Sequence, residues 1–559
     1  MKNKLLGLIL TIVFLTGLLP ANIVSANDVM LSIENIIATP QAENFIIEVT
    51  LNVENAESGK LVIAVYENHQ LLGVAFKDVD VENILTVTVP EKEFYIVKAF
   101  LWESMLSIKP LVQSCEGTVY TAFFVSTVED LQHVGKPQAG TKYENWTLDA
   151  SYKQTADIDM DGEDFTAIGD FDKSFTGIYN GNEKTISNLT VGTSTIECQG
   201  LFGVIMDGIV KNVRIIDCSI AGDWYVGGIV GCNGGSMVEN CYVTGIIVGN
   251  NKVGGVVGLN GAGYNGVGTV QNCYSNAKVS TFFATSGSDI GGVVGQNSGG
   301  AVKNCYAIGD VSGYYWTGGV VGENYAGTVE YCYSAGTVTG TSAAAYTGGV
   351  VGQNQEGTVR NCYSISDVTG YDVVGGVVGC NYNGEVQNCY ATGDIQGDRY
   401  TIGGVVGENR DSMIQNCYSL GNIVGTSIIG GIVGNNGSTT TGGTTRNCVA
   451  LNPSITATTN TAYIGRVLLK GFGTPTNNYA WEDMAVTTNG TWTPDKTLAG
   501  NDGADLTTAD IKSENWWKTA TNWTTDNNAF AWDFENTWEW GANNLPILQN
   551  VDGDQNHTW

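Results

Sequence analysis

Basic residues, histidine and proline are scarce in this chain. It has 26 Lys and Arg against 56 Asp and Glu, only 3 His and 9 Pro, and a net charge of −30. Nucleic acids and anionic membrane surfaces bind basic patches, so this balance argues against both as partners. No C-x-x-C pair occurs, and after the first 20 residues no apolar run is long enough to span a bilayer.

The first residues read as an export signal. Lys2 and Lys4 precede the apolar run Leu5 to Leu19, and Val24-Ser25-Ala26 is a small-residue cleavage site. A membrane anchor is the alternative, but the run is short for a span. We expect a signal peptide over 1–26 and a secreted or extracellular protein, either released or held at the cell surface.

Residues 27–120 show the alternation of half-buried strands. In Phe45 to Val53 every second side chain is apolar, and 60–66, 84–89 and 93–102 continue the pattern between polar turns. This predicts a β-sandwich-like domain.

A glycine–aliphatic–glycine anchor then recurs, and a cysteine follows each copy. The nine anchors start at Gly200, Gly228, Gly255, Gly292, Gly319, Gly349, Gly376, Gly404 and Gly431, and their cysteines are Cys218, Cys241, Cys273, Cys305, Cys332, Cys362, Cys389, Cys417 and Cys448. The step from glycine to cysteine is 13 in six copies (241 − 228, for example), whereas the return to the next glycine varies. A fixed segment beside a variable one is typical of a solenoid with one tolerant turn.

The fold class predicted is therefore all-β, with the sandwich followed by a β-helix. We expect the β-helix over 196–470, an N-terminal cap over 125–195, and a tryptophan-rich C-terminal cap region over 471–559. Caps are needed because an open solenoid end exposes unpaired strand edges.

The recurring cysteines admit three interpretations. Stacked strands lie about 4.8 Å apart, which is inside the Cα range for disulfides, but side chains in register point the same way and make poor bridges. Thirteen cysteines is also an odd number, and a structural metal site wants paired ligands with nearby His. Free thiols in the solenoid wall are favoured over disulfides and over metal.

The neighbours of each cysteine support the wall interpretation. A branched aliphatic stands three residues before most of them, Asn stands one before, and Tyr follows, as in VQNCYATGDI at Val386 to Ile395. Asn tolerates a left-handed bend, and stacked Asn amides can bond each other. The tyrosines should form an aromatic ladder whose face the sequence leaves open.

The anchor together with V-x-N-C-Y-[SA] resembles the GLUG-motif repeat family, over about Gly200 to Val449. Such repeats occur in secreted and surface proteins, and in the non-catalytic region of immunoglobulin A-specific metallopeptidases. The resemblance implies a β-helix-like scaffold without catalytic residues. The H-E-x-x-H site of those peptidases is absent here, since none of His69, His133 and His557 is followed by Glu.

Aromatic residues in the variable return are the candidate binding residues. They are Trp224, Tyr225, Phe282, Phe283, Tyr314, Tyr315, Trp316, Tyr346, Tyr371 and Tyr400. A row of rings would stack on sugars or grip a protein partner, whereas the plainer interpretation is an external packing ladder or ordinary turn residues.

Two acidic patterns give weaker evidence for a functional site. Asp157, Asp159 and Asp161 resemble the start of a calcium loop, but Ile168 stands where the bidentate Glu belongs, and strand alternation explains the pattern equally well. Asp310, Asp367 and Asp394 recur after the cysteine strand and look like a solvated edge, although a carboxylate pair across coils stays open.

The function predicted is a non-catalytic extracellular scaffold for adhesion to a glycan or a surface or matrix protein, with no cofactor and no metal. The alternative is a polysaccharide lyase or hydrolase, which needs an acid/base constellation that the regular coils do not offer.

Overall fold

The computed structural model describes residues 30–41, 44–54, 60–67, 70–79, 84–90, 94–102, 115–120, 122–261, 266–282, 287–343, 345–437, 442–469, 471, 473–488, 492–523 and 531–555. The predicted signal peptide lies outside these residues. The chain forms two compact units, Met1–Phe123 and Phe124–Trp559.

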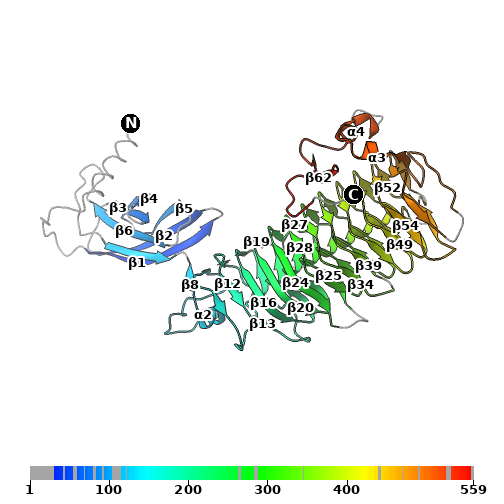
Figure 1. Cartoon of the computed structure of the whole chain (residues 1–559). Coiled ribbons are helices and arrows are strands. Elements are labelled where there is room, and N and C mark those ends of the chain that lie inside the picture. The colour runs from blue at the N-terminus through cyan, green and yellow to red at the C-terminus, as the bar shows by residue number, and fades with distance from the viewer. Residues whose placement is uncertain are drawn as a thin grey trace, which may run out of the picture. The chain divides into compact units, whose positions relative to one another are not determined.

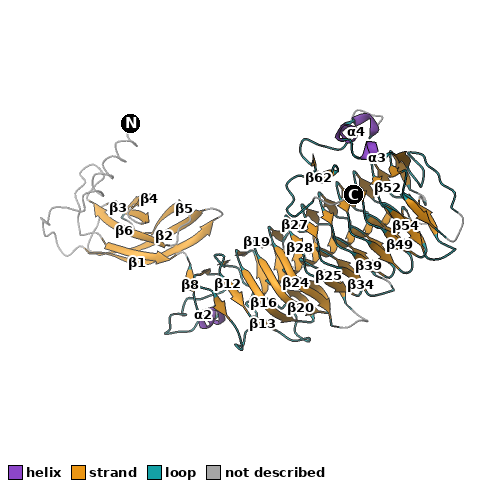
Figure 2. Ribbon diagram, viewed as in Figure 1, coloured by secondary structure: helices purple, strands orange, loops and turns teal. Residues whose placement is uncertain are grey.

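The first unit is a sandwich of two antiparallel sheets (Figure 2). One sheet has the order β1-β2-β5, with β1 at Met30–Gln41, β2 at Asn44–Glu54 and β5 at Ile84–Pro90. The other has the order β4-β3-β6-β7, with β4 at Gln70–Asp78, β3 at Lys60–Glu67, β6 at Phe94–Trp102 and β7 at Cys115–Tyr120. Alternate apolar residues of both sheets form one core, including Val49, Ile63, Val89 and Val97. The predicted all-β architecture of this region is confirmed.

The second unit is a solenoid of stacked coils, which Figure 1 shows as rows of arrows. Each coil crosses four parallel sheets in turn, which we name the turn sheet, the anchor sheet, the valine sheet and the tyrosine sheet. Equivalent residues pair from coil to coil, so the repeats of the sequence are repeats in space. The predicted β-helix is confirmed.

The anchor sheet carries the glycine anchors. Its strands are β14 (Phe202–Met206), β18 (Val230–Gly234), β22 (Val257–Gly261), β26 (Val294–Ser298), β31 (Val321–Tyr325), β36 (Val351–Gln355), β41 (Val378–Tyr382), β46 (Val406–Arg410), β51 (Val433–Asn435) and β56 (Leu468–Leu469). A Cβ on Gly376 would collide with the carbonyl oxygen of Gly404 in the next coil, so the close stacking requires glycine.

The nine predicted anchors lie on nine strands of the anchor sheet, but the solenoid has more coils than nine: this sheet has a tenth strand, β56, and the valine sheet has 13 strands in the described residues. The register Gly430↔Gly465 puts Arg466 where the preceding coil has Gly431. Arg466 is 1% exposed, and its guanidinium contacts Asp505 at 2.7 Å and the carbonyl oxygens of Trp481 and Gly503. An ion pair between the buried Arg466 and the partly exposed Asp505 of the following segment therefore replaces the glycine signal at this coil.

The turn sheet precedes the anchor sheet in each coil. Its strands are β17 (Trp224–Gly227), β21 (Asn251–Gly254), β25 (Ser288–Gly291), β30 (Trp316–Gly318), β35 (Tyr346–Gly348), β40 (Val373–Gly375), β45 (Thr401–Gly403), β50 (Ile428–Gly430) and β55 (Tyr463–Gly465).

The valine sheet and the tyrosine sheet complete the coil. The valine sheet has 13 strands, from β8 (Phe123–Val125), β9 (Ser151–Gln154) and β11 (Ile178–Asn180) to β57 (Thr474–Thr476). The tyrosine sheet has 21, including β16 (Arg214–Ala221), β20 (Tyr242–Gly249), β24 (Tyr274–Thr281), β28 (Tyr306–Ala307), β33 (Tyr333–Ser334), β38 (Tyr363–Ser364), β43 (Tyr390–Ala391), β48 (Tyr418–Ser419), β58 (Tyr479–Trp481) and β60 (Ala504–Leu506).

The bend between the valine and tyrosine sheets follows the predicted chemistry. Asn240, Asn388 and Asn416 have φ near +53°, and the Asn416 amide donates to Asn388 Oδ1 at 3.3 Å. The next residue in each coil is a cysteine, and its side chain is fully buried beside the valine.

A second asparagine ladder lies in the interior, under the turn from the anchor sheet to the valine sheet. Its members are all fully buried: Asn233, Asn260, Asn297, Asn324, Asn354, Asn381, Asn409 and Asn436. Each side-chain amide before the last member donates to Oδ1 of the next member, as Asn354 does to Asn381 at 2.8 Å, and the Asn436 amide donates to the Gly443 carbonyl oxygen. The ladder satisfies polar groups that would otherwise be buried without partners.

The segment after β60 folds back along the tyrosine sheet instead of only closing the end (Figure 1). We call residues 508–523 and 531–555 the strap. It contains α3 (Thr508–Ile511), α4 (Glu514–Lys518), the 3-10 helix at Ala520–Asn522, β61 (Trp538–Trp540) and β62 (Pro546–Leu548). Trp517, Trp523 and Trp538 are buried against Tyr363, Tyr390 and Tyr418. The other described helix, α2, spans Val128–His133 at the opposite end.

Candidate functional site

The candidate aromatic residues lie at the turn before the turn sheet or at its first positions, but they are not equivalent. Trp224, Tyr315, Tyr371 and Tyr400 are 38%, 40%, 42% and 49% exposed. Tyr225, Phe282, Tyr314, Trp316 and Tyr346 are only partly exposed, and Phe283 lies outside the described residues. The structure therefore divides the predicted row into exposed rings and packed rings.

Three of the exposed rings share one register position. Trp224 pairs with Asn251 and Asn251 with Ser288. The pairs Ile290↔Thr317, Trp316↔Tyr346, Tyr346↔Val373 and Val373↔Thr401 then place Tyr315, Ala345, Asp372 and Tyr400 in the same column. Trp224, Tyr315 and Tyr400 are thus three coils apart, or about 14 Å at about 4.8 Å per strand. We call these three residues the turn aromatics.

Each turn aromatic is held by a neighbour. The Lys252 ammonium lies 5.1 Å from the centroid of the Trp224 ring, and the Arg399 guanidinium lies 5.0 Å from that of Tyr400. Tyr315 makes an edge contact with Tyr314 at 4.7 Å. Rings fixed in this way lose less conformational entropy when a ligand stacks on them.

The packed rings line the corner between the turn and anchor sheets. Tyr225 adopts φ of +60° and packs against the cluster that contains Cys232 and Leu259. Trp316 and Tyr346 pair in adjacent coils. Tyr225, Trp316 and Tyr346 are thus half-buried at this corner of the fold.

Lys252 in the same corner bonds a buried carboxylate. Its Nζ lies 3.1 Å from Oδ2 of Asp289, which is 1% exposed, and Oδ1 of Asp289 has no hydrogen-bond partner among the described residues. Burial raises the pKa of Asp289 to about 7, against the pull of Lys252. Glu323 faces the same cluster with Gln296 as its hydrogen-bond donor, and burial raises its pKa too.

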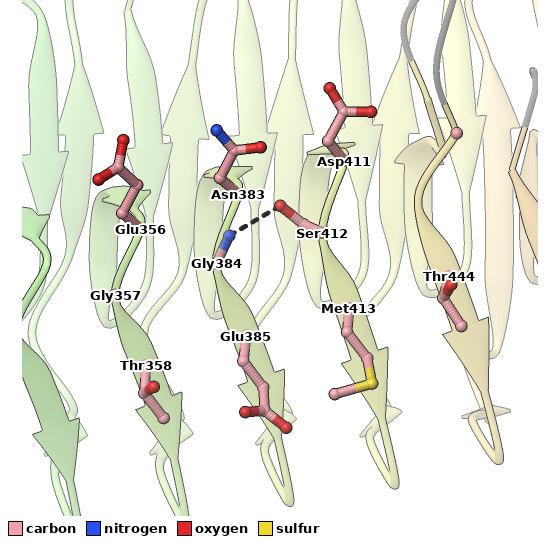
Figure 3. Close-up of a pocket in the computed structure, with 11 residues that line it drawn as sticks. Glu356, Gly357, Thr358, Asn383, Gly384, Glu385, Asp411, Ser412, Met413 and Thr444 are labelled. Atoms are coloured by element: carbon pink, nitrogen blue, oxygen red, sulfur yellow. Dashed lines mark hydrogen bonds between the residues drawn. The ribbon is translucent and has the colours of Figure 1, made fainter.

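A groove of about 760 Å³ crosses the coils at the turn between the anchor and valine sheets (Figure 3). Glu356, Asn383 and Asp411 form one wall, and Thr358, Glu385, Met413 and Thr444 form the other. The floor is Gly357, Gly384 and Ser412, where the Gly384 amide donates to Ser412 Oγ at 3.0 Å. The sequence analysis did not predict this groove. The signal for it is the spacing N-x-x-G, as from Asn354 to Gly357, which places a residue without a side chain at the turn.

The acidic patterns of the sequence have structural partners. Asp367 Oδ1 accepts from the Asp394 backbone amide at 2.9 Å, and Asp394 Oδ1 accepts from Asn422 at 2.8 Å, along an exposed edge. Asp159 lies on β10 (Ile158–Asp159) and accepts from Asn188. In the described residues no three His, Cys, Asp or Glu side chains are grouped so as to hold a metal ion.

The cysteines of the described side chains are all buried free thiols, twelve in number. Cys273 Sγ lies 3.6 Å from the Val238 carbonyl oxygen and 3.2 Å from that of Gln271. Burial raises the pKa of Cys232 and Cys380 to about 12. These thiols are wall material, as favoured above.

Among the described residues, no helix combines the length and apolar character needed to cross a membrane.

Comparisons with known proteins agree with the repeat pattern. The family described as "The GLUG motif" matches residues 222–248, 286–312, 313–339, 343–369, 370–396 and 398–424. Halomucin from Haloquadratum walsbyi (strain DSM 16790 / HBSQ001) is 34% identical over 160 residues, which cover 26% of this chain and 2% of that protein's length. The solved structure of an IgA1 protease aligns with 80% of this chain and 30% of its own at 12% identity, but the TM-score of 0.26 supports no inference. The chain therefore contains GLUG-motif repeats in six places, all within the solenoid.

Proposed function

We propose that this protein is a secreted, non-catalytic scaffold that binds an extracellular glycan or protein chain through the turn aromatics. The observation that carries the proposal is the shared register of Trp224, Tyr315 and Tyr400, each more than a third exposed. The predicted signal peptide supports an extracellular location.

The spacing favours an extended ligand that lies along the stack of coils. Successive turn aromatics are about 14 Å apart, so a small molecule cannot reach two of them, whereas a polymer can contact all three. The residues between them in the column, Asn251, Ser288, Ala345 and Asp372, are small or polar and leave room for a chain to pass. Polar groups there supply hydrogen bonds beside the stacked rings.

The net charge of −30 restricts the ligand. Strongly anionic polymers would be repelled, so neutral or cationic chains are the expected partners. Stacking of an aromatic ring on a sugar face needs no charge, which suits a neutral glycan.

The test is an array of glycans and matrix proteins probed with the folded full-length chain. We expect saturable binding to at least one neutral glycan or protein. Every bound polysaccharide is then assayed for release of reducing ends. Binding without turnover supports the scaffold, whereas turnover shows the alternative, a polysaccharide-active enzyme, and a silent array with folded protein refutes the proposal.

A further inference from the structure

The tyrosine ladder uses its hydroxyl groups where the strap covers it. Tyr363 donates to the Asp552 carbonyl oxygen at 2.7 Å, Tyr390 to Gln555 Oε1 at 2.9 Å, Tyr418 to the Pro546 carbonyl oxygen at 2.7 Å and Tyr479 to the Asn522 carbonyl oxygen at 2.8 Å. A hydroxyl buried without a partner is costly, so the strap is matched to these tyrosines.

The next two rungs of the ladder differ. Tyr306 and Tyr333 stack at 4.6 Å, and Tyr333 stacks on Tyr363 at 4.9 Å, so the rings continue without a break. No residue in the described part of the chain hydrogen-bonds the hydroxyl of either, although Tyr333 is only 8% exposed. Both line a cavity of about 140 Å³, together with Asn272, Asn304, Tyr331, Asn550 and Asp552.

The row of asparagines at the bend between the valine and tyrosine sheets, which we call the outer asparagine ladder, is interrupted at the same cavity. The Asn304 amide donates to Asn272 Oδ1 at 3.1 Å, as in the other coils. The next coil has Tyr331 in the left-handed position, with φ of +55°, so no amide is present to donate to Asn304 Oδ1. Among the described residues the cavity therefore offers two hydroxyl donors without a protein partner, on Tyr306 and Tyr333, and the side-chain oxygen of the exposed Asn304.

The strap closes one side with polar groups. Asn550 and Asp552 line the cavity, and Gly553 passes so close to Tyr333 and Tyr363 that a Cβ there would collide with the Tyr363 hydroxyl. The strap is thus held against the ladder immediately beside the cavity. Its side chains add an amide and a carboxylate to the lining.

The size and chemistry select a small polyhydroxylated ligand. The volume corresponds to about five waters at about 30 Å³ each, below the roughly 300 Å³ at which drug-sized ligands are enclosed. Its lining residues carry both donors and acceptors, which suits neighbouring hydroxyls that both donate and accept. The Asp552 carboxylate and the absence of a basic residue from the cavity lining disfavour an anion.

We propose that this cavity binds one neutral pyranose unit, with the hydroxyls of Tyr306 and Tyr333, the Asn304 side-chain oxygen and the Asp552 carboxylate as its hydrogen-bond partners. The site is formed on the tyrosine sheet and the strap, so it does not depend on the turn aromatics. The strap then acts as one wall of a binding site in addition to covering the ladder.

The test is saturation-transfer NMR of the full chain with D-glucose, D-galactose, D-mannose and N-acetyl-D-glucosamine, each alone. At least one sugar should receive saturation, and Tyr306→Phe with Tyr333→Phe should weaken its binding about tenfold, since two hydrogen bonds are lost. Both rings stay in the ladder, so the variant should fold. Tyr274→Phe is the matched control, because it removes a hydroxyl one rung away from the cavity, and it should bind like the wild type.

Three results would overturn the site. The first is that folded protein transfers saturation to none of the four sugars, which leaves water as the occupant. The second is that the Tyr306→Phe, Tyr333→Phe variant binds sugar as well as wild type. The third is that monosaccharide binding is lost when Trp224, Tyr315 and Tyr400 are changed to Ala. The last result places the sugar at the turn aromatics, and so separates failure of this site from failure of the proposed function.

Discussion

Replacing Asn354 by Ala tests how the interior asparagine ladder holds the coils together. The Asn354 amide donates to Asn381 Oδ1 at 2.8 Å and to the Gly357 carbonyl oxygen at 3.0 Å, and its own oxygen accepts from Asn324 at 2.7 Å. Alanine removes all three bonds at a fully buried position.

The loss of stability in Asn354→Ala depends on which hydrogen bonds each former partner of Asn354 keeps. The Gly357 carbonyl oxygen still accepts from Glu385, and the Asn324 amide still donates to Gly327. Asn381 Oδ1 keeps no donor from the described residues. One orphaned buried acceptor costs about 1–3 kcal/mol, and the small void adds to this, so we expect a loss of about 2–4 kcal/mol in local stability.

Hydrogen exchange of the backbone amides measures this directly, because solenoid coils open locally as well as globally. Amides of β36 and β41 should exchange roughly 30-fold to 1000-fold faster, at about 1.4 kcal/mol per tenfold change. Thr358→Ala is the matched control, since Thr358 lies in the same coil, partly exposed, and its side chain makes no hydrogen bond in the described residues. If Asn354→Ala exchanges like this control, the ladder does not stabilise the coils.

Three further predictions concern other parts of the chain. Because the pKa of Asp289 is raised from 3.8 to about 7 in the folded protein, its contribution to stability should be greatest below about pH 4, fall as pH rises to about 7 and then level off; thermal melts of wild type and Asp289→Asn at pH 5 and pH 8 should differ by this fall, and an equal pH dependence of the two would contradict it. Ellman's reagent should detect at most one of the 13 thiols in the native protein and all 13 after unfolding, since twelve are buried and free; several fast-reacting thiols in the native protein would contradict the burial of these cysteines in the solenoid wall. Trp538→Ala should cost about 3–5 kcal/mol and expose the strap to limited proteolysis, because this fully buried ring packs 4.6 Å from Trp532 and 6.1 Å from Tyr418; a strap as resistant as wild type would refute the packing.

Local signals in the sequence predicted much of the fold. The glycine anchors, the asparagine bends and the cysteine wall recur at fixed steps, and each needs only its neighbours in register to take its place. The tenth coil was hidden because Arg466 replaces a glycine and bonds Asp505, 39 residues later (505 − 466). No local sequence pattern predicts an ion pair between residues this far apart in the chain.

The candidate site was predicted less well, for a related reason. Composition marked the aromatic return, but the exposure of each ring depends on the register position that it takes on its strand. Trp316 pairs with Tyr346 in the packed corner, while Tyr315, one residue earlier, is exposed. The sequence likewise did not predict that the tryptophans of the strap cover the tyrosine ladder. This packing joins residues more than 100 positions apart, such as Tyr418 and Trp538 (538 − 418).

The affinity of a ligand found on the array, measured for wild type and for a variant with Trp224, Tyr315 and Tyr400 changed to Ala, tests the central claim most directly. We expect each single change to weaken binding roughly tenfold and the triple change to abolish it. A variant with Tyr325→Ala and Tyr382→Ala, which removes rings of similar exposure, 40% and 37%, on the anchor sheet, should bind like wild type. Unchanged affinity of the triple variant, or equal loss in the control, would contradict binding through the turn aromatics.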